Sequence, residues 1–174
     1  MKKIVCNVIA SVFAFATSAA FAQSAAPNDA QIAGIVVTAN TVDIDAGKLA
    51  QKMSTNKEVR QFGKQMVTDH SGVNKQATAL VKKLKVKPED SDISKSLKAD
   101  GDANISKLKG LKGAAFDKAY VDNEVSYHQA VIDAMDKTLV PNAKNAELKG
   151  MLEKVKPAFV AHLEHAKKIQ QSLK

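Results

Sequence analysis

Apolar side chains recur at steps of three and four residues along almost the whole chain, which is the spacing of one face of an α-helix. No segment shows the two-residue alternation that a half-buried strand needs. Alanine, lysine, leucine and glutamine are abundant and tryptophan is absent, so the composition also favours helix. The sequence therefore predicts an all-α fold.

Breaks in this pattern divide the chain into four long helices and one short, polar helix. The tight connections between them predict an antiparallel four-helix bundle with one additional helix. Thr55 and Glu58 match the capping box that satisfies free backbone donors, so they predict the start of the second helix. Pro157 falls inside the last helix and predicts a bend there. The predicted helices cover residues 29–53, about 55–84, 91–109, 116–139 and about 148–173.

The first residues have the features of a secretory signal peptide. Two lysines precede a mostly apolar run, and Ala20-Phe21-Ala22 matches an A-x-A cleavage site before Gln23. The apolar run, residues 4–16, is shorter than the ~20 residues that a membrane-spanning helix needs. We therefore expect export to the periplasm or beyond and a soluble mature protein. The predicted parts are a signal peptide (1–22), a flexible lead-in (23–28) and a single helical-bundle domain (29–174).

Cysteine and arginine usage narrows the possible partners of the mature chain. Cys6 is the sole cysteine and leaves with the signal peptide, so any metal must be held by His, Asp or Glu. The net charge is +8, yet Arg60 is the only arginine. Export and the scarcity of arginine argue against nucleic acid as a partner. A lysine-rich surface is expected to be solvated, with peripheral contact to anionic lipid or lipopolysaccharide at the outer membrane as its plausible interaction.

All four histidines fall on predicted helices and have carboxylates close by in sequence. His70 lies in the apolar register of its helix beside Asp69, and Glu124 lies one turn before His128. Imidazole and carboxylate ligands suit a transition metal such as Fe, Zn, Cu or Ni. The sequence thus predicts a metal site in the bundle, and the alternative is a set of structural core histidines hydrogen-bonded to these carboxylates. The candidate ligands are Asp69, His70, Glu124, His128 and His162, with Asp43, Asp45 and His165 as weaker candidates.

Several segments resemble the exported bacterial family of unknown function numbered 4142. They are Gly47-Lys48-Leu49-Ala50, Met66-Val67-Thr68-Asp69-His70, Phe116-Asp117-Lys118-Ala119-Tyr120, His128, and Pro157 to Leu163. The resemblance extends from about Asp29 to Ile169 and implies a ferritin-like bundle, in a family whose members often carry an outer-membrane label. It singles out Asp69, His70, Phe116, Asp117, Tyr120, His128, Pro157 and His162. Members commonly have Glu before the Gly-Lys-Leu-Ala segment, where this chain has Asp43 and Asp45.

Two functions follow from these features as hypotheses. The first is an exported helical bundle that binds a metal or small ligand through core-facing histidines and carboxylates. The second is a non-catalytic envelope interaction or stress protein whose histidines are purely structural. Di-iron oxidoreductase chemistry is disfavoured because the paired Glu-x-x-His motifs are absent, and no Gly-x-Ser-x-Gly turn or Gly-rich phosphate loop supports a hydrolase or nucleotide enzyme.

Overall fold

The computed structural model describes residues 26–173, and every long element in this range is a helix. This confirms the all-α prediction. The predicted signal peptide and residues 23–25 of the lead-in lie outside the described residues. Within the described range, no helix combines the length and the apolar character that crossing a membrane requires.

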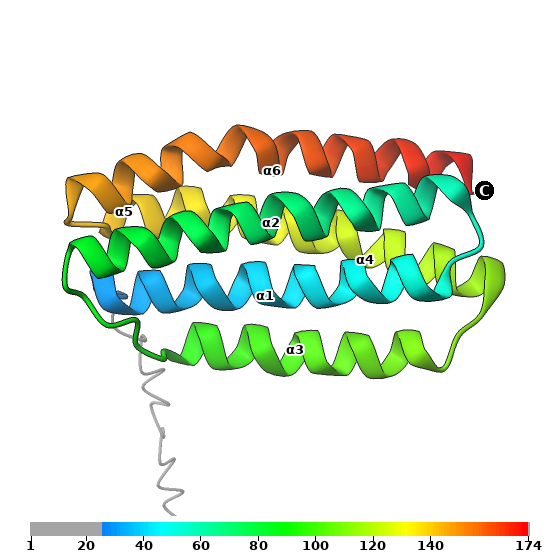
Figure 1. The fold of residues 1–174 in the computed structure, drawn as a ribbon, viewed down its shortest axis with the longest axis horizontal. Coiled ribbons are helices and arrows are strands. Elements are labelled where there is room, and N and C mark those ends of the chain that lie inside the picture. Colours follow the sequence, from blue (N-terminus) through cyan, green and yellow to red (C-terminus); the bar gives the residue numbers. More distant parts are fainter. Residues whose placement is uncertain (1–25, 174) are drawn as a thin grey trace, which may run out of the picture.

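Figure 1 shows the helices running roughly parallel or antiparallel to one another along the long axis of the molecule. The long helices α1, α2, α4 and α6 form the bundle, and α3 lies against the outer side of α1. Between α4 and α6 the chain forms a π-helical turn, η1, and the short helix α5. The elements are α1 (Asp29–Met53), α2 (Lys57–Lys83), α3 (Asp92–Lys109), α4 (Gly113–Ala134), η1 (Met135–Leu139), α5 (Val140–Asn142) and α6 (Ala146–Ser172).

Asparagine side chains start the long helices α1, α2 and α6. Asn28 forms a reciprocal capping box with Gln31 at the start of α1. At α2 the predicted Thr55–Glu58 capping box is wrong, because Asn56 is the N-cap and accepts from the backbone N–H of Glu58 at 2.8 Å. Asn is among the strongest N-cap residues, and its position directly before the helix lets it reach these free donors. Asn145 caps α6 in the same way.

The fourth predicted helix ends differently from its sequence pattern. The pattern predicts one regular helix to residue 139, but α4 ends at Ala134 and a π-helical turn follows. Met135 and Leu139, the first and last residues of this turn, both lie in the core, at 2% and 4% exposure. Pro141 is the second residue of the short α5 (Val140–Asn142), directly after the π-helical turn, and it has no backbone N–H to donate. By contrast, α6 runs without interruption through Pro157 and is curved in Figure 1.

The core consists of two apolar clusters separated by a polar layer. One cluster is centred on Ile32, Leu152 and their neighbours, and the other on Phe62, Tyr120 and their neighbours. Each long bundle helix contributes apolar residues to both clusters and polar residues between them. The buried polar residues of this layer are Asn40, Asp43, His70, Glu124, His128 and His162.

Helices α1 and α2 cross closely at a pair of glycines next to the polar layer. A Cβ atom on Gly63 would lie 2.8 Å from the carbonyl oxygen of Gly47 and 2.9 Å from the Cβ atom of Ala50. Real Cβ atoms do not approach backbone so closely, so the absence of a side chain sets the separation of α1 and α2. This crossing lies one turn from Asp43 along α1.

We expect Gly63→Ala to lower the free energy of unfolding by about 1–3 kcal/mol, because the added methyl group forces two backbones apart. Gly72→Ala in the same helix is the matched control, since nothing lies within 4 Å of its Cβ position. That control should gain about 0.5–1 kcal/mol, as expected for Gly→Ala in an open helical position. Urea unfolding followed by circular dichroism measures both, and equal gains in the two variants would contradict the close crossing.

Candidate metal centre

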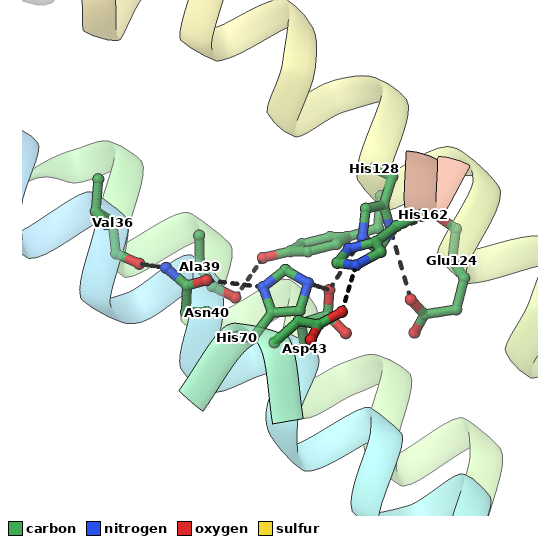
Figure 2. A network of polar contacts seen from close by, with 10 residues as sticks. Val36, Ala39, Asn40, Asp43, His70, Glu124, His128 and His162 are labelled. Carbon is green, nitrogen blue, oxygen red and sulfur yellow. Dashed lines mark hydrogen bonds and ion pairs between the residues drawn. The ribbon is translucent and has the colours of Figure 1, made fainter. Parts of the chain in front are cut away.

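Four helices bring one set of titratable side chains into the polar layer between the apolar clusters. Asp43 comes from α1, His70 from α2, Glu124 and His128 from α4, and His162 from α6. All five are buried, with exposed fractions of 3% or less. Figure 2 shows the imidazoles and the Asp43 carboxylate pointing toward one another.

The three imidazoles form a nearly equilateral triangle. Their ring centroids are 5.6 Å apart for His70 and His128, 5.3 Å for His70 and His162, and 5.4 Å for His128 and His162. One ring nitrogen of each lies within 4.8 Å of the others. A single ion held at about 2.0–2.1 Å from each nitrogen could therefore bridge them after small side-chain shifts.

The outward nitrogen of His70 has a defined role. His70 Nδ1 lies 2.7 Å from Asn40 Oδ1, and Asn40 Nδ2 donates to the Val36 carbonyl at 2.7 Å. Since the Asn40 amide nitrogen is already used as a donor, its oxygen must accept, and His70 Nδ1 carries the hydrogen. A neutral His70 then has its lone pair on Nε2, which is the nitrogen facing Asp43.

His128 and His162 have the same arrangement with different acceptors. His128 Nδ1 lies 3.0 Å from the backbone carbonyl of Glu124, one turn earlier in α4. His162 Nε2 lies 2.9 Å from the carboxylate of Asp69 on α2. A carbonyl and a carboxylate accept hydrogen bonds, so these nitrogens donate and the opposite nitrogen of each neutral ring holds a lone pair.

Within residues 26–173, the inward atoms have no hydrogen-bond partner. These atoms are His70 Nε2, His128 Nε2, His162 Nδ1 and both carboxylate oxygens of Asp43. Asp43 Oδ2 nevertheless lies 3.0 Å from His70 Nε2 and 3.4 Å from His128 Nε2. Lone pairs of neutral imidazoles and a carboxylate repel one another at this separation, and a shared cation removes the repulsion.

Burial and the neighbouring charges set the protonation of these groups. Burial lowers the pKa of His128 to about 4. Burial also lowers the pKa of His162, and outweighs the hydrogen bond to Asp69, which acts in the opposite direction. Burial by itself would raise the pKa of Asp43, but when the imidazoles are protonated, a hydrogen bond from His70 and the positive charge of the rings, His70 foremost, bring the pKa below its ordinary value. At neutral pH the layer therefore holds the Asp43 carboxylate and at least two neutral rings, those of His128 and His162.

Glu124 lies at the edge of this group. It forms a second compact set with Asp43 and His128, and its Oε2 lies 3.5 Å from His128 Nδ1, the outward nitrogen. Burial raises the pKa of Glu124 well above its ordinary value, and the charge of Asp43 adds to the effect. Glu124 thus lies beside the donating side of His128, and its Oε2 has no hydrogen-bond partner among the described residues.

The other candidate ligands occupy different places. Asp69 stays outside the triangle, with 41% of its side chain exposed, and holds the outer nitrogen of His162. Asp45 is exposed and pairs with Lys48, so the structure does not bring it to the group. His165 lies one turn further along α6, where its Nδ1 is 3.3 Å from Gln65 Oε1. Asp43, the weaker candidate, is the carboxylate at the centre.

Asn40 is the residue that the sequence prediction missed. Its side chain is 2% exposed and fixes the orientation of His70. It lies one turn before Asp43, between the apolar residues Val36 and Ala46 on the buried face of α1. A polar residue at a position in the apolar register of the first helix is the sequence signal that could have identified Asn40.

The segment from Phe116 to Tyr120, which also carries the family resemblance, lies in the apolar core. Phe116 and Tyr120 are fully buried in the cluster around Phe62, and their rings stack with centroids 6.3 Å apart. Asp117 is also buried, at 4% exposure, and is not part of either compact set of metal-ligating residues.

Comparison with known proteins places this chain in a family. Residues 14–169 match the model of a domain of unknown function, DUF4142. The chain belongs to the DUF4142 family. This confirms the resemblance noted in the sequence, and the match includes all four helices that carry the histidine triangle and Asp43.

A solved structure has the same fold as this DUF4142 chain. It is a DUF305 protein from Streptomyces coelicolor that is described as secreted; the superposition has a TM-score of 0.68 with 10% sequence identity. The match covers 82% of this chain and 91% of that protein. At this identity the likeness concerns the fold alone. A search of curated proteins finds no match.

Proposed function

We propose that this DUF4142 protein is exported and binds one divalent transition-metal ion in the core of its helical bundle. The ligands are His70 Nε2, His128 Nε2, His162 Nδ1 and the carboxylate of Asp43. A single observation carries the proposal: among the described residues, each of the three rings directs one N–H outward to an acceptor and has a second nitrogen without a partner, and two of these second nitrogens lie 3.0 and 3.4 Å from Asp43 Oδ2.

The outer hydrogen bonds match those found around bound metals. Metal-ligating histidines almost always donate their second ring N–H to a carboxylate, a carbonyl or a similar acceptor, which fixes the tautomer and the ring orientation. Here the acceptors are the Asn40 amide, the Glu124 carbonyl and the Asp69 carboxylate. Structural histidines in a core would instead use both nitrogens in hydrogen bonds.

The donor set selects a class of metal. Three imidazoles and one carboxylate suit Zn, Cu, Fe or Ni, whereas Ca and Mg prefer an all-oxygen shell. A divalent cation would also offset the negative charge of the buried Asp43 carboxylate, which is 1% exposed. The proposal concerns metal binding alone and assigns no catalysed reaction to the site.

Metal retention tests this proposal. The protein expressed from Gln23 is loaded separately with Zn, Fe, Cu and Ni, desalted, and analysed for metal content by mass spectrometry. About one equivalent of at least one metal should remain bound, and His70→Ala/His128→Ala/His162→Ala should retain none while still folding as a helical protein. No retained metal in the wild type, or equal retention in the triple variant, would overturn the proposal.

Asn40→Ala is expected to weaken metal binding without removing a ligand. Loss of the acceptor frees the His70 ring to rotate and to change tautomer, and such outer-shell changes typically cost ~10–100-fold in metal affinity. Competition with a chromophoric chelator measures the change in dissociation constant. Thr41→Ala is the matched control, since Thr41 is exposed and bonds only outside the centre. Equal affinities for the Asn40 variant and the wild type would show that Asn40 does not orient His70.

A further inference from the structure

A cavity of about 110 Å³ lies beside the histidine triangle, within the apolar cluster around Ile32 and Leu152. Residues of α1, α2, α3, α4, η1 and α6 line it, and almost all of the lining atoms are apolar. An engineered apolar cavity of roughly 150 Å³ stays dry and binds benzene or xenon. The cavity here is of the same order of size and has the same chemical character.

Asn40 and Tyr127 are the polar residues in the wall, and both have their polar atoms engaged elsewhere. The Asn40 side chain bonds to the Val36 carbonyl and to His70. The Tyr127 hydroxyl donates to the Ala39 carbonyl at 2.7 Å. The cavity thus offers no free hydrogen-bonding group to a polar ligand or to water, which needs two or more polar partners.

Three wall residues also contact the metal centre. The Phe159 ring lies 4.9 Å from the His70 ring, between centroids, and Asn40 bonds directly to His70. The Tyr127 ring lies 6.1 Å from that of His128. A molecule in the cavity is therefore separated from the histidines by single side chains.

The wall becomes more exposed between α3 and α4. Phe159 and Asn40, next to the centre, are 5% and 2% exposed. Leu97 of α3 and Ala134 of α4 are half-buried, and Ala130 of α4 is exposed. The gradient indicates that the cavity opens toward solvent at the seam between these two helices and ends at the histidine triangle.

We propose that this cavity binds a small uncharged apolar molecule, between a diatomic gas and benzene in size, and holds it beside the metal centre. Binding of the molecule rests on the cavity alone. Its position beside a metal rests on the proposed metal site. Xenon is the probe, because it is apolar, monatomic and detectable by ¹²⁹Xe NMR.

The cavity is tested first in metal-free protein. Wild type should give a saturable ¹²⁹Xe shift, and Ala134→Leu and Leu97→Phe should each reduce it at least several-fold by filling the space. Ala114→Leu, an exposed alanine of the same helix α4, is the control and should bind xenon as wild type does. The absence of a saturable shift in wild type, or unreduced binding in whichever filled variants fold, would overturn the cavity proposal.

Paramagnetic relaxation then tests whether the bound xenon lies beside the metal centre. Xenon bound to Co(II)-loaded protein should relax much faster than xenon bound to Zn(II)-loaded protein, and the difference should vanish in His70→Ala/His128→Ala/His162→Ala. Equal relaxation with both metals bound would contradict the adjacency. If neither metal binds, the metal proposal fails by itself, and xenon binding to the metal-free protein still decides whether the cavity exists.

Discussion

His128→Leu is expected to abolish metal retention while leaving the metal-free protein at least as stable as the wild type. The mutation removes a central ligand, so its cost in metal affinity should exceed the ~10–100-fold typical of outer-shell changes. The His128 ring is fully buried and its Nε2 has no hydrogen-bond partner among the described residues, while Nδ1 bonds to the Glu124 carbonyl, an oxygen that the helix also satisfies through its backbone N–H four residues on. Replacing such a group with an apolar side chain of similar volume is often neutral or stabilising.

Metal analysis after desalting and urea unfolding in the presence of a chelator measure the two halves of this prediction. His165→Leu is the matched control, because His165 lies on α6 outside the triangle and should leave metal retention unchanged. A structural role for His128 predicts the reverse pattern. Metal retention would then be unaffected, and the metal-free variant would lose about 1–3 kcal/mol because of the missing hydrogen bond.

Asp43→Asn is expected to remove most of the increase in the free energy of unfolding that metal binding gives the wild type. In the wild type, metal at 100 times its dissociation constant should raise the free energy of unfolding by about 2.7 kcal/mol. The variant loses the only charged oxygen ligand at the centre and should gain far less at the same metal concentration. Its metal-free form should be at least as stable as the wild type, because the amide can donate to the lone pair of His70 or His128.

Urea unfolding with chelator and with metal measures both effects of the Asp43 substitution. Asp45→Asn, in the exposed Lys48 pair two residues further on, is the control and should behave as wild type. A metal-free Asp43→Asn protein that loses 3–5 kcal/mol would instead identify Asp43 and a protonated His70 as a buried ion pair, since breaking such a pair carries about that cost.

The helices were predictable because their signals are local. The first helix, 29–53, is confirmed at both ends, and the polar helix predicted over 91–109 begins one residue later because Ser91 is its N-cap. The capping box at Thr55 was wrong because two good cap residues, Thr55 and Asn56, stand side by side, and the sequence does not show which one takes the extended conformation. The π-helical turn left no signal in the apolar spacing.

Whether the histidines meet depends on where the chain reverses its direction. The sequence indicates that position less clearly than it indicates the helices themselves. Counted from Pro141, His128 and His162 differ by eight residues in distance along the chain, which predicts a mismatch of ~12 Å. The structure reverses at residues 143–145, after η1 and α5. From Lys144 the two histidines lie 16 residues before and 18 residues after, so they reach the same level of the bundle.

The orientation of each imidazole ring could not be predicted from the sequence. Whether a core histidine uses one nitrogen or both is decided by partners on other helices, such as Asn40 for His70 and Asp69 for His162. The sequence placed Asp69 among the ligands because it neighbours His70, but adjacent residues on a helix point in different directions. Asp43 lies within 3.4 Å of two imidazoles, one turn from the tight crossing of α1 and α2 at Gly47 and Gly63.

The most direct test of the proposed centre is a crystal structure of the zinc-loaded protein, with anomalous diffraction recorded above and below the zinc edge. The proposed centre predicts one strong peak inside the bundle, about 2.0–2.1 Å from His70 Nε2, His128 Nε2, His162 Nδ1 and an oxygen of Asp43. A peak only at the surface or at His165, or an interior in which Asp43 and His70 share a proton and no zinc is bound, would contradict it.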